Sequence, residues 1–77
     1  GDLWKRNELS ARDRSLITVA ALIALSRSEQ LPFHLDLAVS NGVTHTELSE
    51  VITHLAFYAG WPAAASALSR FAALNDQ

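Results

Sequence analysis

The amino-acid sequence predicts a single all-α domain over residues 1–77. Helix caps punctuate the chain, apolar residues recur at spacings of three and four, and no alternating apolar and polar run is bounded by hairpin turns. A chain of 77 residues is long enough for one domain only. A composition with 49% hydrophobic and 18% charged residues excludes an intrinsically disordered chain.

The first helix is predicted over residues 12–26. Ser10 followed by Asp13 is typical of an N-cap with an acidic third residue, whereas residues 2–9 show no period and are expected to be extended or loosely coiled. Residues 15–25 are apolar nearly all round, which predicts a helix buried on several sides. Their β-branched side chains would also suit a strand, but the length, the alanines and the capped start favour a helix.

Cap and turn residues divide the rest of the chain into three more helices. Pro32 and Pro62 each suit the first turn of a helix. The helix from Pro32 runs to about residue 41, where Gly42 offers a left-handed position, and the helix from Pro62 runs to about residue 74. A capping box at residues 44–47 starts the helix between them, and Gly60 ends it. That helix has an apolar stripe at helical spacing: Leu48, Val51, Ile52, Leu55, Ala56 and Ala59.

Composition excludes several classes of function. Six basic against eight acidic residues give a net charge of −2, so a broad basic surface for nucleic acid is not expected. The chain has no cysteine, which excludes disulfides, thiolate metal sites and thiol redox chemistry. Its longest apolar run, residues 16–25, is about half of the roughly twenty residues that a bilayer span needs. Because the chain also begins with no signal-peptide pattern, we predict a cytoplasmic protein.

The size of the chain predicts self-association. A domain this small buries only about 60% of the surface of its unfolded chain, yet nearly half of the residues are hydrophobic. Without disulfides, the excess apolar surface is expected to lie in subunit interfaces. We therefore expect a homo-oligomer.

Histidines and carboxylates are the first candidates for chemistry. His34 and His54 lie in apolar company, where a satisfied interior histidine is the commoner reading than a catalyst, while His45 sits in the capping box and is expected to be solvated. Glu29, five residues before His34, either interacts with it or complements the start of the second helix. Glu50 lies one turn before His54 and forms, on the simplest reading, a surface pair with it. No spacing matches a metal-binding signature, so no metal is expected.

Arginines and aromatic residues are the candidates for binding. A guanidinium beside an apolar cavity is a natural carboxylate receptor, which draws attention to Arg14, although an ordinary ion pair is as plausible for it and for Arg12. Tyr58 and Trp61 form, with Phe57, an aromatic cluster around Gly60 that either contacts a ligand or packs in a core or interface.

Four segments in order give the chain a family resemblance: LSARDRSLITVAAL (9–22), EQLPFHL (29–35), AVSNGVT (38–44) and VITHLAFYAGWPA (51–63). Together they resemble the carboxymuconolactone decarboxylase family, and the resemblance extends over about residues 3–74. It implies a small helical subunit of the alkylhydroperoxidase D-like type, assembled as a trimer or hexamer.

One branch of this family reduces a peroxidase partner through a pair of cysteines. By resemblance, His34 falls on the histidine of that branch, Ser15 on its glutamate, and the two cysteine positions fall on Arg27 and Gln30. Because thiol chemistry needs a thiolate, this chain is excluded from that activity.

The decarboxylase branch of the family converts 4-carboxymuconolactone to an enol-lactone in aromatic catabolism, without a cofactor. The resemblance implies that His34 acts as acid or oxyanion donor, that Glu29 orients it, and that His54 is a second proton-handling group. Arg14 would receive a carboxylate, and Tyr58 and Trp61 would line the substrate site. The alternative is an oligomeric binding or scaffold protein that kept the fold and lost the chemistry.

Overall fold

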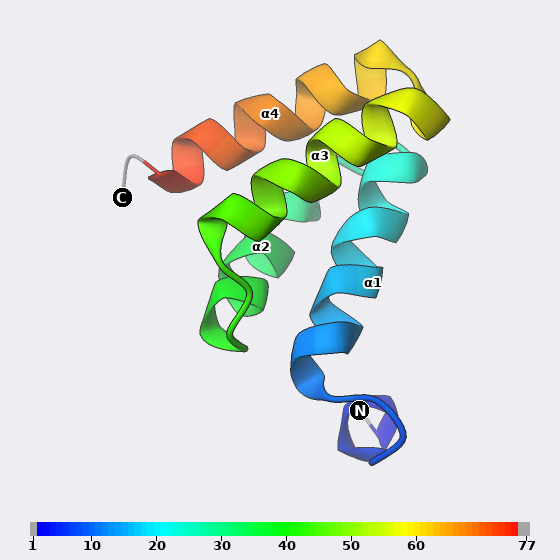
Figure 1. Ribbon diagram of the computed structural model, residues 1–77, viewed down its shortest axis with the longest axis vertical. Coiled ribbons are helices and arrows are strands. Elements are labelled where there is room, and N and C mark those ends of the chain that lie inside the picture. The colour runs from blue at the N-terminus through cyan, green and yellow to red at the C-terminus, as the bar shows by residue number, and fades with distance from the viewer. Residues whose placement is uncertain (1, 76–77) are drawn as a thin grey trace.

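The computed structural model describes residues 2–75 and is helical throughout its regular elements. A short 3-10 turn, Asp2–Lys5, precedes four α-helices: α1 (Ala11–Ala24), α2 (Leu31–Ser40), α3 (His45–Ala59) and α4 (Trp61–Asn75). Figure 1 shows α1 rising, α2 returning behind it, α3 rising beside α1, and α4 folding back along α3. The predicted all-α fold class is confirmed.

The helices pack as two pairs. α1 packs most extensively on α2, and α3 on α4, while α1 also contacts α3 and α2 contacts α4. All four α-helices contribute to one core, which consists of Val19, Leu22, Ile23, Leu31, Leu35, Ala38, Val43, Leu48, Ile52, Ala63, Ala64, Ala67 and Phe71. The apolar stripe predicted for the third helix faces this core, with Leu48 and Ile52 fully buried and its other members packed at the margin.

Two predicted helix starts are confirmed. The Ser10 side chain accepts a hydrogen bond from the Asp13 amide at 3.0 Å and caps α1. At the start of α3, the Thr44 hydroxyl accepts from the Glu47 amide, while the Glu47 carboxylate accepts from the Thr44 amide. Each of these two residues thus provides a hydrogen-bond acceptor for the backbone amide of the other, which the start of a helix would otherwise leave unpaired.

Two helices end with the same pair of hydrogen bonds, although the residues differ. After α2, Gly42 (φ +101°) donates to Val39 and Val43 donates to Ala38, which is the Schellman arrangement. The end of α1 has the matching bonds, but its left-handed residue is Ser26 (φ +58°). The prediction that the first helix continues to residue 26 is therefore wrong by two residues, because a serine takes the position that usually calls for glycine.

Two further expectations need correction. Residues 2–5 form a regular 3-10 turn within the segment 2–9 that was expected to be extended or loosely coiled, and the Arg6 amide donates to the Leu3 carbonyl at 3.3 Å. In addition, a single chain buries α1 on one side only: Ser15, Val19, Leu22 and Ile23 are buried, while Ile17 is 56% exposed. The exposed apolar side of α1 forms part of the groove described next.

Candidate active site

The main candidate site is an open groove between α1 and α3, here called the α1–α3 groove. It has a volume of about 440 Å³ and is lined by Leu16, Ile17 and Ala20 from α1 and by Glu50, Val51, His54 and Leu55 from α3. Most of this lining is aliphatic. His54 and Glu50 are its two titratable side chains.

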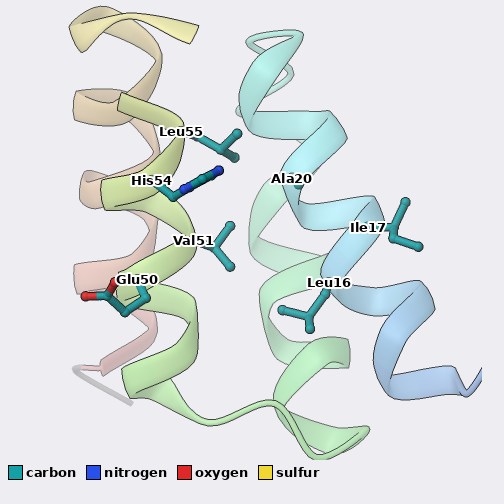
Figure 2. Close-up of a pocket in the computed structure, with 7 residues that line it drawn as sticks. All are labelled: Leu16, Ile17, Ala20, Glu50, Val51, His54 and Leu55. Carbon is teal, nitrogen blue, oxygen red and sulfur yellow. The ribbon is translucent and has the colours of Figure 1, made fainter. Parts of the chain in front are cut away.

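The two titratable side chains of the groove differ in direction. Figure 2 shows the His54 ring pointing across the groove toward α1, with Val51 and Leu55 on either side of it, while the Glu50 carboxylate points away. The expected surface pair between Glu50 and His54 is therefore not formed in this arrangement. The groove presents one imidazole to an otherwise apolar space.

His54 also has an aromatic neighbour. The Tyr58 ring lies one turn further along α3, with the ring centroids 4.8 Å apart and the planes inclined by 33°. Tyr58 is 77% exposed, so the burial of its own side chain is not what holds it there. Of the residues predicted for the site, the structure brings these two together.

A second set of polar side chains lies between α1 and α2, here called the α1–α2 seam. The Asn41 side-chain amide donates to the Ser15 hydroxyl at 3.0 Å, and Ser15 is only 1% exposed. His34 lies seven residues before Asn41, and therefore on the same face of α2. The Nδ1 atom of His34 and the Nε atom of Arg14 are both buried without a hydrogen-bond partner.

The α1–α2 seam and the α1–α3 groove lie on different sides of α1. Leu16 and Ala20 face α3, whereas Ser15 faces α2. Along the antiparallel pair α1 and α2, His34 and Arg14 are also about two helical turns apart, or roughly 10 Å. One chain thus keeps His34, Arg14 and His54 from meeting in one pocket.

The other predicted site residues lie elsewhere. Glu29 is exposed in the connection between α1 and α2 and lines a polar hollow of about 350 Å³ with its neighbours in residues 25–30. Trp61, 71% exposed, lines a separate apolar hollow of about 240 Å³ between α3 and α4, together with Phe57. The aromatic cluster around Gly60 is therefore exposed in one chain rather than part of its core.

Arg12 forms ion pairs within the fold rather than acting as a receptor for a substrate carboxylate. Its guanidinium binds the Glu47 carboxylate and lies 3.5 Å from the Asp13 carboxylate. The hydrogen bond from the Thr44 amide, followed by that from Arg12, lowers the pKa of Glu47 below its ordinary value of 4.5. Glu47 thus caps α3 and also ties the start of α3 to the start of α1.

Sequence reasoning did not find the aliphatic walls of the groove or the Ser15–Asn41 pair. Leu16 and Ala20 carry no chemical signal, and only the packing of α1 against α3 makes them neighbours of His54. Asn41 precedes a glycine, so its sequence context indicates a helix end and not a buried contact. A serine directly before an apolar run was the signal from composition for a polar contact at Ser15.

Two further findings concern the described part of the chain. Within residues 2–75, no helix is both long and apolar enough to cross a bilayer. In the same residues, no three histidine, aspartate or glutamate side chains gather as a metal ion would require.

The fold and the groove define a small, all-helical protein with a histidine aimed into an apolar site. The carboxymuconolactone decarboxylase family model matches residues 1–73, and the chain belongs to this family. The resemblance seen in the sequence is thereby confirmed.

Two curated relatives match the same length of chain. A 4-carboxymuconolactone decarboxylase of Acinetobacter baylyi is 46% identical over 68 residues, which cover 88% of this chain and 51% of the relative. The nitrosuccinic acid decarboxylase npaB of Metarhizium robertsii is 35% identical over 68 residues, with 88% and 48% covered. The chain thus spans about half the length of the curated relatives that it matches.

Proposed function

We propose that this chain carries out, or forms part of a protein that carries out, a cofactor-free decarboxylation of a small carboxylic acid of the 4-carboxymuconolactone type. The observation that supports the proposal most directly is the His54 imidazole pointing into the aliphatic α1–α3 groove. Both curated relatives carry names of decarboxylases.

The groove suits the two requirements of this reaction. Breaking the bond to the carboxylate releases CO2 and leaves an electron pair on carbon, which in 4-carboxymuconolactone is delocalised through the alkene onto the lactone carbonyl. An aliphatic wall made by Leu16, Val51 and Leu55 gives the departing carboxylate an apolar surface to lie against. The imidazole of His54 then delivers a proton to carbon, a role that histidine performs near neutral pH.

The names of the two relatives share a chemical theme that fits this scheme. A lactone carbonyl and a nitro group both accept the electron pair that decarboxylation releases. We therefore propose that the substrate is a carboxylic acid with such an electron-accepting group, in a pathway of aromatic catabolism for the lactone case. The cytoplasmic location stays a prediction.

The remaining predicted site residues stay part of the proposal in a different form. His34, with Glu29 to orient it, is the competing acid, and its unpartnered Nδ1 atom supports it. Because α1 separates His34 and Arg14 from His54, one site containing all three would need two chains. We propose a homo-oligomer, a trimer or hexamer by family resemblance, which also covers the exposed Phe57 and Trp61 side chains.

The test is turnover by the purified protein and three histidine variants. The protein is incubated with 4-carboxymuconolactone and, separately, with nitrosuccinic acid, while substrate loss and CO2 release are followed. We expect His54→Ala to lower kcat by about 10²–10⁴-fold. His45→Ala is the matched control, because His45 is exposed and lies outside the groove, and it is expected to keep wild-type turnover.

The outcome for His34→Ala separates the two acids. A loss of turnover in His34→Ala with normal turnover in His54→Ala would move the site to the α1–α2 seam. No turnover by the wild-type protein with either substrate would favour the oligomeric binding or scaffold reading. The oligomeric state itself is measured by sedimentation equilibrium.

A further inference from the structure

The orientation of the His54 ring needs an explanation, because His54 is exposed. Within the described part of the chain, no hydrogen bond holds either of its ring nitrogens. Val51 and Leu55 flank it on the groove side. An exposed side chain without a hydrogen bond is free to leave the groove by changing rotamer unless further contacts hold it.

Tyr58 supplies a further contact from the next turn of α3. Side chains on a helix lean toward its N-terminus, so the residue at i+4 covers the residue at i. Accordingly the Tyr58 ring lies over that of His54 at a centroid distance of 4.8 Å, with an inclination of 33°. The contact restricts the imidazole between the tyrosine ring and the aliphatic wall.

The two other histidines meet aromatic rings in a different way. His34 meets Phe33 at an interplanar angle of 89°, and His45 meets Phe71 at 76°. Both arrangements are T-shaped. Among these three contacts, that of His54 with Tyr58 has the two ring planes closest to parallel.

We propose that Tyr58 is a positioning residue that holds the His54 imidazole in the α1–α3 groove. This inference rests on the proposed function in so far as His54 is the proton donor. It differs from the role in substrate binding that the resemblance implies for Tyr58, because here the tyrosine acts through the histidine. An aromatic ring at position 58 is what matters, and the hydroxyl is not required.

The first test is structural and needs no substrate. Proton NMR of the full chain compares the wild type with Tyr58→Leu, Tyr58→Phe and the control Phe57→Leu. We expect the His54 ring protons of the wild type to show ring-current displacement and nuclear Overhauser contacts with the Val51 and Leu55 methyl groups. Tyr58→Leu should lose both, and Tyr58→Phe should keep both.

Phe57→Leu is the matched control for removing an exposed aromatic ring from the same turn of α3. Phe57 is 83% exposed and lines the hollow between α3 and α4 instead of the α1–α3 groove. It should leave the His54 signals in place. Unchanged His54 signals in Tyr58→Leu would overturn the proposal.

The second test is kinetic. For a substrate that the wild type turns over, we expect Tyr58→Leu to lower kcat roughly ten-fold while KM changes by less than about two-fold, because a misplaced acid slows proton transfer more than binding. Tyr58→Phe should restore kcat. A change in KM alone would overturn the proposal in favour of direct substrate binding by Tyr58.

The two tests separate this inference from the proposed function. Absence of turnover in the wild type refutes the decarboxylase assignment for these substrates, while the NMR comparison still decides whether Tyr58 orients His54. Conversely, turnover that depends on His54 and is indifferent to Tyr58→Leu refutes the positioning role alone.

Discussion

The two sides of α1 differ in what they pack against. Toward α2 the helix presents polar groups, with Ser15 bonded to Asn41 and with buried nitrogens of Arg14 and His34 nearby. Toward α3 it presents aliphatic side chains across an open groove, and a charged contact between Arg12 and Glu47 ties the starts of α1 and α3 together.

This difference shows that polar residues alone are a poor guide to a site. The α1–α2 seam holds more side chains capable of chemistry, yet it is closely packed and its best-defined polar contact serves the fold. The α1–α3 groove has a single imidazole, but it also has space for a ligand and an aliphatic wall. Decarboxylation needs both of these more than it needs many polar groups.

The comparison between the two sides of α1 is tested most directly by adding side-chain volume at single positions of the helix. Ala20 lines the α1–α3 groove, whereas the next residue, Ala21, is exposed and lies two turns on from Arg14. We expect Ala20→Phe to lower kcat/KM by about 100-fold by occupying the groove. Turnover is measured with the substrate on which the wild type is active.

Ala21→Phe is the control, with the same added volume at an exposed position that does not line the groove. It should keep kcat/KM within about two-fold of the wild type, and both variants should retain the wild-type circular dichroism spectrum. The reverse result, with Ala21→Phe inactive and Ala20→Phe active, would contradict the assignment of the site to the α1–α3 groove.

The seam should respond in stability rather than in activity. Ser15→Ala leaves the Asn41 amide without its acceptor in a part-buried place, so we expect the free energy of unfolding to fall by about 1–2 kcal/mol. Urea denaturation measures it. Ser69→Ala, at an exposed position of α4, should change it by less than about 0.5 kcal/mol. Equal effects would show that the Ser15–Asn41 bond contributes nothing.

The contribution of Glu47 to the stability of the fold should depend on pH. Because the pKa of Glu47 is lowered in the folded protein, its contribution to stability is complete above the ordinary value of 4.5 and is lost as the pH falls through the lower folded-state value. We expect the melting temperature of the wild type to fall more steeply in this acid range than that of Glu47→Gln. Parallel curves for the two proteins would contradict the prediction.

The smallest effect on stability is expected directly after the C-terminal end of α1. Ser26 has a φ of +58°, a conformation that glycine adopts without strain. We therefore expect Ser26→Gly to raise the free energy of unfolding by about 0.5–1 kcal/mol. Gly42→Ser, at the equivalent position after α2, should lower it, and thermal denaturation of both variants provides the check.

The sequence allowed the helices to be predicted far better than the site. Ser10, Thr44, Gly42 and Gly60 act on neighbours a few residues away, so their effects can be read locally, and all four lie where predicted. Ser26 shows the limit of this reasoning, because nothing in its chemistry indicates a left-handed residue.

The grouping of site residues depends instead on how helices pack. Each of the two histidines was a candidate from its own surroundings, but the side of α1 on which each falls is set by contacts such as Ser15 with Asn41. The same holds for Tyr58. Its spacing of four from His54 predicts a contact, whereas the groove into which His54 points forms only where α1 packs against α3.

The connection between α3 and α4 has a consequence for the entropy of the chain. Gly60 alone joins two helices of 15 residues each, with φ of +93°, and its carbonyl accepts the first hydrogen bond of α4. A closure this short costs little conformational freedom, in contrast to the six residues between α1 and α2. A single backbone position therefore sets the angle between α3 and α4, and strain introduced there passes directly into the helices, since no loop is present to absorb it.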